Sequence, residues 1–198
     1  MGRVSQAQAQ ENRQRVVATA SRMFREKGTA VSVADLMKAA GLTHGGFYKQ
    51  FASKEDLVDE AIAHAFDDPA AHSAVALEEH AGEHEAARRT LIEHYLSVSH
   101  RDHAGGGCPV SGFAADLGRE PDQAARARHV YINGVRNLAA RLATGDDDGM
   151  AQFCTMVGAL VLARATRGNP LSEELLQAAR TALTESGTGQ SAPQQRTD

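Results

Sequence analysis

The chain carries a short run of polar and cationic residues interspersed with glycines and aromatic residues. Within residues 41–57, hydroxyl, imidazole, phenol and ammonium groups alternate with glycines and phenylalanines. Ammonium and hydroxyl groups bind phosphate oxygens, and glycines let a backbone approach a ligand closely. The candidate DNA-binding residues are Ser32, Thr43, His44, Gly45, Tyr48, Lys49 and Lys54.

Two short helices are expected to present these residues. Ser32 followed by Asp35 predicts a capped helix start, and a second short helix is expected at about 44–50, capped by Thr43. This pair is typical of a helix-turn-helix, in which the second helix enters the major groove. We expect Thr43, Tyr48 and Lys54 to bind phosphates and His44 and Lys49 to lie nearer base edges.

The whole chain is expected to be helical. Alanine and leucine recur at helical spacing, no proline precedes Pro69, and strand-like alternation is nowhere sustained. A first helix at about 8–27, with Phe47 and Phe51 as core anchors, completes a three-helix head. Further helices are predicted from Ser53 to about 66 and at about 73–101, 109–118, 122–143, 148–167 and 172–185.

The charge distribution separates a basic head from an acidic body. Residues 1–55 contain nine Lys and Arg against four Asp and Glu, a net of +5, whereas the remainder has a net of −9. This asymmetry indicates that only the head meets a polyanion. The sequence has neither an apolar run of about twenty residues nor a signal peptide, so we expect a cytoplasmic protein with no membrane contact. Two distant cysteines suit a reducing compartment.

Several positions in the opening stretch resemble the signature of TetR/AcrR-type transcriptional regulators, and "VSVADLMKAAG" before it resembles their second helix. The matching residues are Gly41, Leu42, Thr43, Gly45, Tyr48, Phe51, Ser53, Lys54, Glu55 and Leu57. Gly46 and Gln50 depart from the family pattern. The base-reading residues vary within the family, so the operator sequence is not implied.

The resemblance implies an all-α protein that is a regulator, most simply a repressor, and not an enzyme, with no cofactor. Such proteins bind a palindromic operator in double-stranded DNA as homodimers and release it when a small-molecule effector binds. The implied organisation is a DNA-binding domain at 1–53, with its helix-turn-helix at about 33–50, and a larger ligand-binding and dimerisation domain at 54–185. Residues 186–198 are expected to form a disordered tail. Arg3, in an arm before the first helix, could reach the minor groove or remain solvated.

The larger domain offers candidates for an effector pocket between helices. These are Phe66, Tyr95, Phe113, Tyr131, Asn133 and Phe153. The alternative for each of them, and the commoner role of such residues, is a place in the core. The resemblance places the dimer interface on 150–165 and 171–183, where small residues such as Gly158 permit close approach; an internal core helix is the alternative.

Cys108 is a candidate redox sensor. Pro109 suits the first position of a helix, so Cys108 falls at or next to its N-cap, where the helix dipole favours a thiolate. This resembles regulators of the family that carry a reactive cysteine in the effector domain. The alternative is a buried, inert thiol. Cys154 is expected to be a packing residue.

Nine histidines raise the possibility of a metal site. His80 and His84 are four residues apart with Glu83 beside them, but no spacing specifies a tight set of ligands, and no metal is expected. Two other hypotheses remain: a helical-bundle metal-binding protein or enzyme that uses the histidines, and an adaptor that kept the fold but lost DNA binding.

Overall fold

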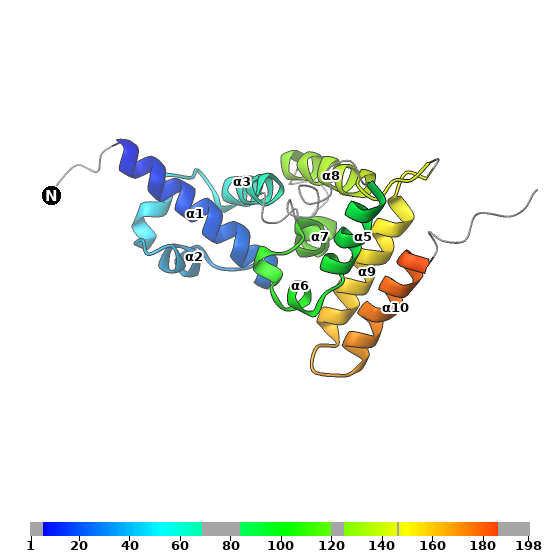
Figure 1. The fold of residues 1–198 in the computed structure, drawn as a ribbon. Helices are drawn as coiled ribbons and strands as arrows, with labels where there is room; N and C mark the ends of the chain where they lie inside the picture. The colour runs from blue at the N-terminus through cyan, green and yellow to red at the C-terminus, as the bar shows by residue number, and fades with distance from the viewer. Residues whose placement is uncertain (1–5, 69–83, 120–124, 146, 186–198) are drawn as a thin grey trace, which may run out of the picture. The chain divides into compact units, whose positions relative to one another are not determined.

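A computed structural model describes residues 6–68, 84–119, 125–145 and 147–185 (Figure 1). The regular elements in these ranges are helices, and none of them is a strand. The expected all-α class is therefore confirmed. The helices divide into two compact units, one from residues 1–72 and 103–137 and one from 73–102 and 138–198.

The first unit contains the predicted head and four later elements that pack with it. Its elements are α1 (Gln6–Lys27), α2 (Val33–Ala39), the 3₁₀ helix η1 (His44–Lys49), α3 (Lys54–Asp67), η3 (Ala104–Gly106), α7 (Pro109–Arg119) and most of α8 (Ala125–Ala140). One apolar face of each long helix fills its core, which includes Val16, Phe24, Leu36, Met37, Phe47, Leu57, Ile62 and Phe113. Burial of these side chains holds α1, α2, η1 and α3 together.

The second unit is built around two consecutive helices that pack against each other, α9 (Met150–Ala165) and α10 (Leu171–Glu185). The helices α5 (His84–Tyr95) and α6 (Val98–Asp102) pack against this pair. A buried polar link fixes α6 to the start of α10 and the end of α9. Arg101 Nη1 donates to Ser172 Oγ at 2.8 Å, and that hydroxyl donates to the Ala163 carbonyl at 2.7 Å. Both buried polar side chains therefore have partners, as burial requires.

The predicted helix starts at Ser32 and Ser53 are confirmed. The Ser32 hydroxyl accepts from the Asp35 amide and the Ser53 hydroxyl from the Asp56 amide, each at 3.1 Å. Each serine satisfies an amide that the helix itself leaves unbonded.

The single helix predicted at 73–101 was wrong over its described part, which forms α5 and α6. Ser97 explains the break, because its hydroxyl accepts from the His100 amide at 3.1 Å and starts a new helix.

The boundary expected between residues 53 and 54 divides the chain by function, whereas the two compact units divide it by packing. In the structure α3, which follows residue 53, packs on α1 in the first unit. The boundary stays a prediction.

Candidate nucleic-acid interface

A tight turn after α2 places η1. Gly41 adopts a positive φ of 72°, which favours glycine because it has no Cβ. The Gly41 amide donates to the Lys38 carbonyl at 3.1 Å and the Leu42 amide to the Met37 carbonyl at 2.9 Å. These two bonds form a Schellman motif, which ends α2 and turns the chain toward η1.

Two phenylalanines anchor η1 to the core. Phe47 is fully buried, and its ring stacks on Phe51 with centroids 5.4 Å apart. Tyr48 points the other way: 68% of the residue is exposed, and its ring meets Phe47 edge to face at 5.1 Å. One short helix therefore has a buried apolar side and an exposed polar side.

The exposed side of η1 gathers most of the predicted DNA-binding residues. Thr43, His44, Gly45, Tyr48 and Lys49 are all exposed. No atom lies within 4 Å of the place where a Cβ on Gly45 would stand, so the backbone there is open to a ligand. The structure thus brings these five residues onto one surface.

Two details of η1 differ from the prediction. It is a 3₁₀ helix, and the Thr43 side chain makes no capping hydrogen bond. Glycines at 45 and 46 weaken an α-helix, and the Thr43 carbonyl instead accepts from the Gly46 amide at 3.0 Å, three residues on. The Thr43 side chain therefore does not serve the helix start.

Ser32 and Lys54 lie at the starts of the two flanking helices. The Ser32 hydroxyl caps α2 and also donates to the Asp35 carboxylate at 2.7 Å. Lys54 is the first residue of α3 and is partly exposed. A cation beside the open amides of a helix start suits a phosphate, since both groups attract an anion.

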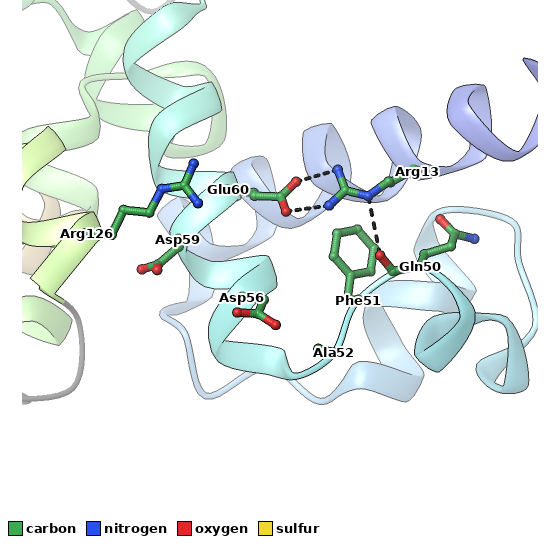
Figure 2. A pocket seen from close by; sticks show the side chains of 8 residues that line it. All are labelled: Arg13, Gln50, Phe51, Ala52, Asp56, Asp59, Glu60 and Arg126. Carbon is green, nitrogen blue, oxygen red and sulfur yellow. Dashed lines mark hydrogen bonds and ion pairs between the residues drawn. The ribbon is translucent and has the colours of Figure 1, made fainter.

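Arg13 is a residue that the sequence analysis missed. Its guanidinium donates to both carboxylate oxygens of Glu60 at 2.6 and 2.5 Å, and its Nε donates to the Gln50 carbonyl at 3.4 Å (Figure 2). It also lies 4.7 Å from the centre of the Phe51 ring. One signal was available, because Arg13 precedes the buried Val16 and Ala20 by three and seven residues, which puts it on the same helix face.

The candidate effector residues divide between the two units. In the first, Phe113 is buried in the core, and Phe66 meets Tyr131 edge to face at 6.0 Å. The Tyr131 hydroxyl donates to the Val110 carbonyl at 3.0 Å, and burial, with a smaller contribution from Cys108, raises the pKa of Tyr131 to about 12. In the second unit, Tyr95 and Phe153 are core residues.

Asn133 does not take the alternative place in the core. Its side chain is exposed and pairs with His129 one turn earlier on α8, at 3.1 Å. The amide thus satisfies itself within its own helix. The pocket itself stays a prediction.

Cys108 is buried, with 3% of the residue exposed. As expected, it directly precedes α7, and its carbonyl accepts from the Gly112 amide at 3.2 Å. The buried Arg25 lies nearby and donates to the adjoining Gly107 carbonyl at 2.9 Å. Burial lowers the pKa of Arg25, and the nearby Asp68, Cys108 and Glu26 partly oppose this effect.

Cys154 was expected to pack in the core and is exposed in this protomer instead. The helix period explains this, because Phe153, Met156 and Leu160 take the buried face of α9.

Within the described ranges, no three or more His, Cys, Asp or Glu side chains are grouped so as to hold a metal ion. No helix of those ranges is both long and apolar enough to cross a membrane. Arg3, His80, Glu83 and the tail 186–198 lie outside the described residues.

Known proteins resemble the head and the whole fold to different extents. The family described as "Bacterial regulatory proteins, tetR family" matches residues 16–61. The HTH-type transcriptional regulator AcrR of Shigella flexneri is 39% identical over 61 residues, which are 30% of this chain and 28% of that protein. The match to this curated relative thus spans little more than a quarter of its length.

Solved structures extend the likeness to both units. A TetR transcriptional regulator from Chloroflexus aurantiacus shares 24% identity with a TM-score of 0.71, covering 93% of this chain and 98% of that one. AibR, solved with isovaleryl coenzyme A and operator DNA, shares 14% identity with a TM-score of 0.55, covering 87% of this chain and 98% of that one. Residues 16–61, which contain the exposed polar side of η1, thus match the tetR family, and the fold of the chain resembles that of solved TetR regulators.

Proposed function

We propose that the protein represses transcription by binding a palindromic operator in double-stranded DNA as a homodimer, and that a small molecule releases it. The observation that carries the DNA-binding role is the exposed row, which consists of Thr43, His44, Gly45, Tyr48 and Lys49. Phe47 and Phe51 anchor this row to the core. Apart from the edge-to-face contact of Tyr48 with Phe47, the exposed tyrosine, lysine and histidine beside the open glycine backbone make few contacts with the core of the head. They suit phosphates and base edges.

Each residue of the exposed row has a proposed role, as do Ser32 and Lys54 at the starts of the flanking helices. Tyr48, Thr43 and Lys54 bind phosphates, because their hydroxyl and ammonium groups are donors on or beside the exposed side of η1. His44 and Lys49 reach toward base edges. The open backbone at Gly45 permits close approach, and Ser32 contributes from the start of α2.

Dimerisation is proposed through α9 and α10. Several large apolar side chains on and beside α9 are exposed in the protomer, although α9 also supplies core residues. They are Met150, Val161, Leu162 and Leu171. Gly158 is exposed among them and leaves open space for a partner helix. Burial of this surface in a second copy would remove it from water.

A dimer has a physical advantage for DNA binding. One η1 offers only a few side chains to bases, whereas two heads at the spacing of successive major grooves combine their contacts and fix the register. The proposed organisation is therefore a DNA-binding domain at 1–53 and a ligand-binding and dimerisation domain at 54–185, in a cytoplasmic protein.

Release by a small-molecule effector is the proposed form of regulation. AibR shares this fold and was solved with an acyl coenzyme A and operator DNA together. Phe66, Phe113, Tyr131 and Asn133 of the first unit, and Tyr95 and Phe153 of the second, remain the candidate contacts. Phe66 and Tyr131 already touch, so a ligand entering between them must separate their rings.

Modification of Cys108 is proposed as an alternative input. The thiol directly precedes α7, and the Arg25 guanidinium lies near it. Because the thiol is buried, a reagent reaches it only when the surrounding structure opens locally.

Genomic selection tests the proposed function. Purified protein is incubated with sheared DNA of its own genome, and bound fragments are sequenced. We expect enrichment of an inverted repeat, and a protein–DNA complex containing two protomers. The absence of any enriched sequence, with no complex on the protein's own upstream region, would contradict the proposal.

A further inference from the structure

One arginine joins three segments that must keep a fixed relation for η1 to meet DNA. Arg13 belongs to α1, Gln50 follows η1 directly, and Glu60 lies two turns into α3. The Arg13 guanidinium bonds to the Gln50 carbonyl and to both oxygens of Glu60 (Figure 2). Its position over the Phe51 ring adds a cation–π contact at the same place.

The planar shape of arginine makes this arrangement specific. A guanidinium that donates in parallel to two carboxylate oxygens fixes direction as well as distance. Gln50 also donates its amide to the Phe47 carbonyl at 2.8 Å, so the carbonyl that Arg13 holds belongs to the last turn of η1. Arg13 therefore constrains the C-terminal end of η1 against α1 and α3.

The neighbouring residue on α3 contacts a different helix. Asp59 accepts a hydrogen bond from the backbone of Ala127 and lies near Arg126, both on α8. Burial raises the pKa of Asp59, and these two partners partly oppose that effect. Adjacent carboxylates on α3 thus bind α8 on one side and Arg13 on the other. A shift of α3 would be felt by both.

Stability alone does not account for the ion pair. The Arg13 and Glu60 side chains are 41% and 27% exposed, and ion pairs of that exposure add little to folding stability. The bidentate bond between Arg13 and Glu60, together with the bond from Arg13 to the Gln50 carbonyl, instead suits holding η1 in a fixed orientation against α1 and α3.

From these contacts we propose that Arg13 and Glu60 form a positioning pair for DNA binding: they hold η1 in the orientation that presents Tyr48 and Lys49, without touching DNA themselves. The inference rests on the proposed function. It adds residues outside the exposed row to those on which operator affinity depends.

A direct phosphate contact by Arg13 is the competing explanation, and the sign of the Glu60 effect separates the two. Glu60→Gln removes a negative charge, so electrostatics alone would strengthen binding to DNA. A positioning pair predicts weaker binding, because Arg13 loses its bidentate partner. Arg13, Asp56 and Glu60 line one pocket (Figure 2). The matched control is Asp56→Asn, because it removes a carboxylate of this pocket that is not bonded to Arg13.

The experiment compares the parent, Arg13→Gln, Glu60→Gln, the double variant and Asp56→Asn, at a temperature where all are fully helical by circular dichroism. Operator affinity is measured across salt. We expect each single variant to lose about tenfold, the double variant to lose no more than either, and the slope with salt to stay unchanged. Asp56→Asn should bind at least as tightly as the parent.

Amide hydrogen exchange of residues 41–53 provides a readout that needs no DNA. We expect the amides at the end of η1 to exchange faster in Arg13→Gln and in Glu60→Gln than in the parent. In Asp56→Asn they should exchange at the parent's rate. Parent-like exchange and affinity in Glu60→Gln would overturn the positioning pair while leaving the proposed function intact. If the parent binds no operator, the proposed function fails, and the exchange data still decide whether the pair orders η1.

Discussion

The ring of Phe66, on α3, lies directly against the backbone of Gly134, on α8. A methyl group on Gly134 would overlap the ring atoms. The same ring meets Tyr131 edge to face, so the glycine permits an aromatic side chain to fit between two turns of α8. This contact fastens the end of α3, as the Asp59 contact with Ala127 fastens its middle.

Replacement of Gly134 by alanine should therefore destabilise the protein despite the better helix propensity of alanine. Displacing the Phe66 ring costs up to about 3 kcal/mol, against roughly 1 kcal/mol gained in propensity. Urea unfolding followed by circular dichroism measures the difference. Gly118→Ala is the matched control, because Gly118 lies in α7 with open space around it, and this variant should be neutral or slightly more stable.

Acid should weaken the second unit through His100. Burial, with smaller contributions from Arg164 and His94, lowers the pKa of His100 from 6.5 to about 4, although its bond to the Tyr95 carbonyl opposes this. The unfolded chain then binds more protons than the folded one between those pH values. The folding stability that neutral His100 preserves above pH 6.5 is thus lost as pH falls toward 4, by about 1 kcal/mol per pH unit.

Urea unfolding at several pH values between 7 and 4.5 tests this for the parent and for His100→Gln. The variant should show a smaller loss on acidification than the parent. Equal slopes for the two proteins would show that other groups carry the pH dependence.

The exposed face of α9 should separate dimer from monomer. Leu162 is 53% exposed, and Leu162→Glu should raise the dimer dissociation constant by at least about tenfold, because a charge would be buried at the interface. Analytical ultracentrifugation gives the constant. The matched control is Arg89→Glu, at an exposed site on α5 that makes only a weak ion pair with Glu93. A dimer unaffected by Leu162→Glu would place the interface elsewhere.

Cys108→Ser tests the alternative input. If oxidation of Cys108 releases DNA, the serine variant should stay bound under peroxide while the parent dissociates. A Cys154→Ser variant is the control, because it removes the chain's other thiol and should still dissociate under peroxide as the parent does. Equal release of the parent and Cys108→Ser would exclude Cys108 as a sensor.

The sequence predicted the helices because their local signals agree with the packing. Serines at 32 and 53 cap helices as expected, and Gly41 ends α2 where a positive φ is needed. The exposed row of η1 followed from the same reasoning, since Phe47 and Phe51 had to be the buried side.

Other features depend on contacts between segments far apart in the sequence. Arg13 and Glu60 are 47 residues apart, and no local pattern pairs them. The burial of Cys108 depends on the packing around Arg25. The exposure of Asn133 depends on which face of α8 packs against α3. A 3₁₀ geometry for η1 was within reach of the sequence, given two adjacent glycines, but propensity alone does not choose between two short helices.

The salt dependence of operator binding tests the central claim most directly. Affinity of the parent for its selected operator should fall steeply with salt, because Lys54 and its neighbours displace counterions from phosphates. In a dimer, Lys54→Ala removes two such contacts and should make the slope of log affinity against log salt shallower by about 2. Lys27→Ala, at an exposed position outside the proposed interface, should leave the slope unchanged. A slope near zero for the parent, or equal slopes for the parent and Lys54→Ala, would contradict DNA binding through this surface.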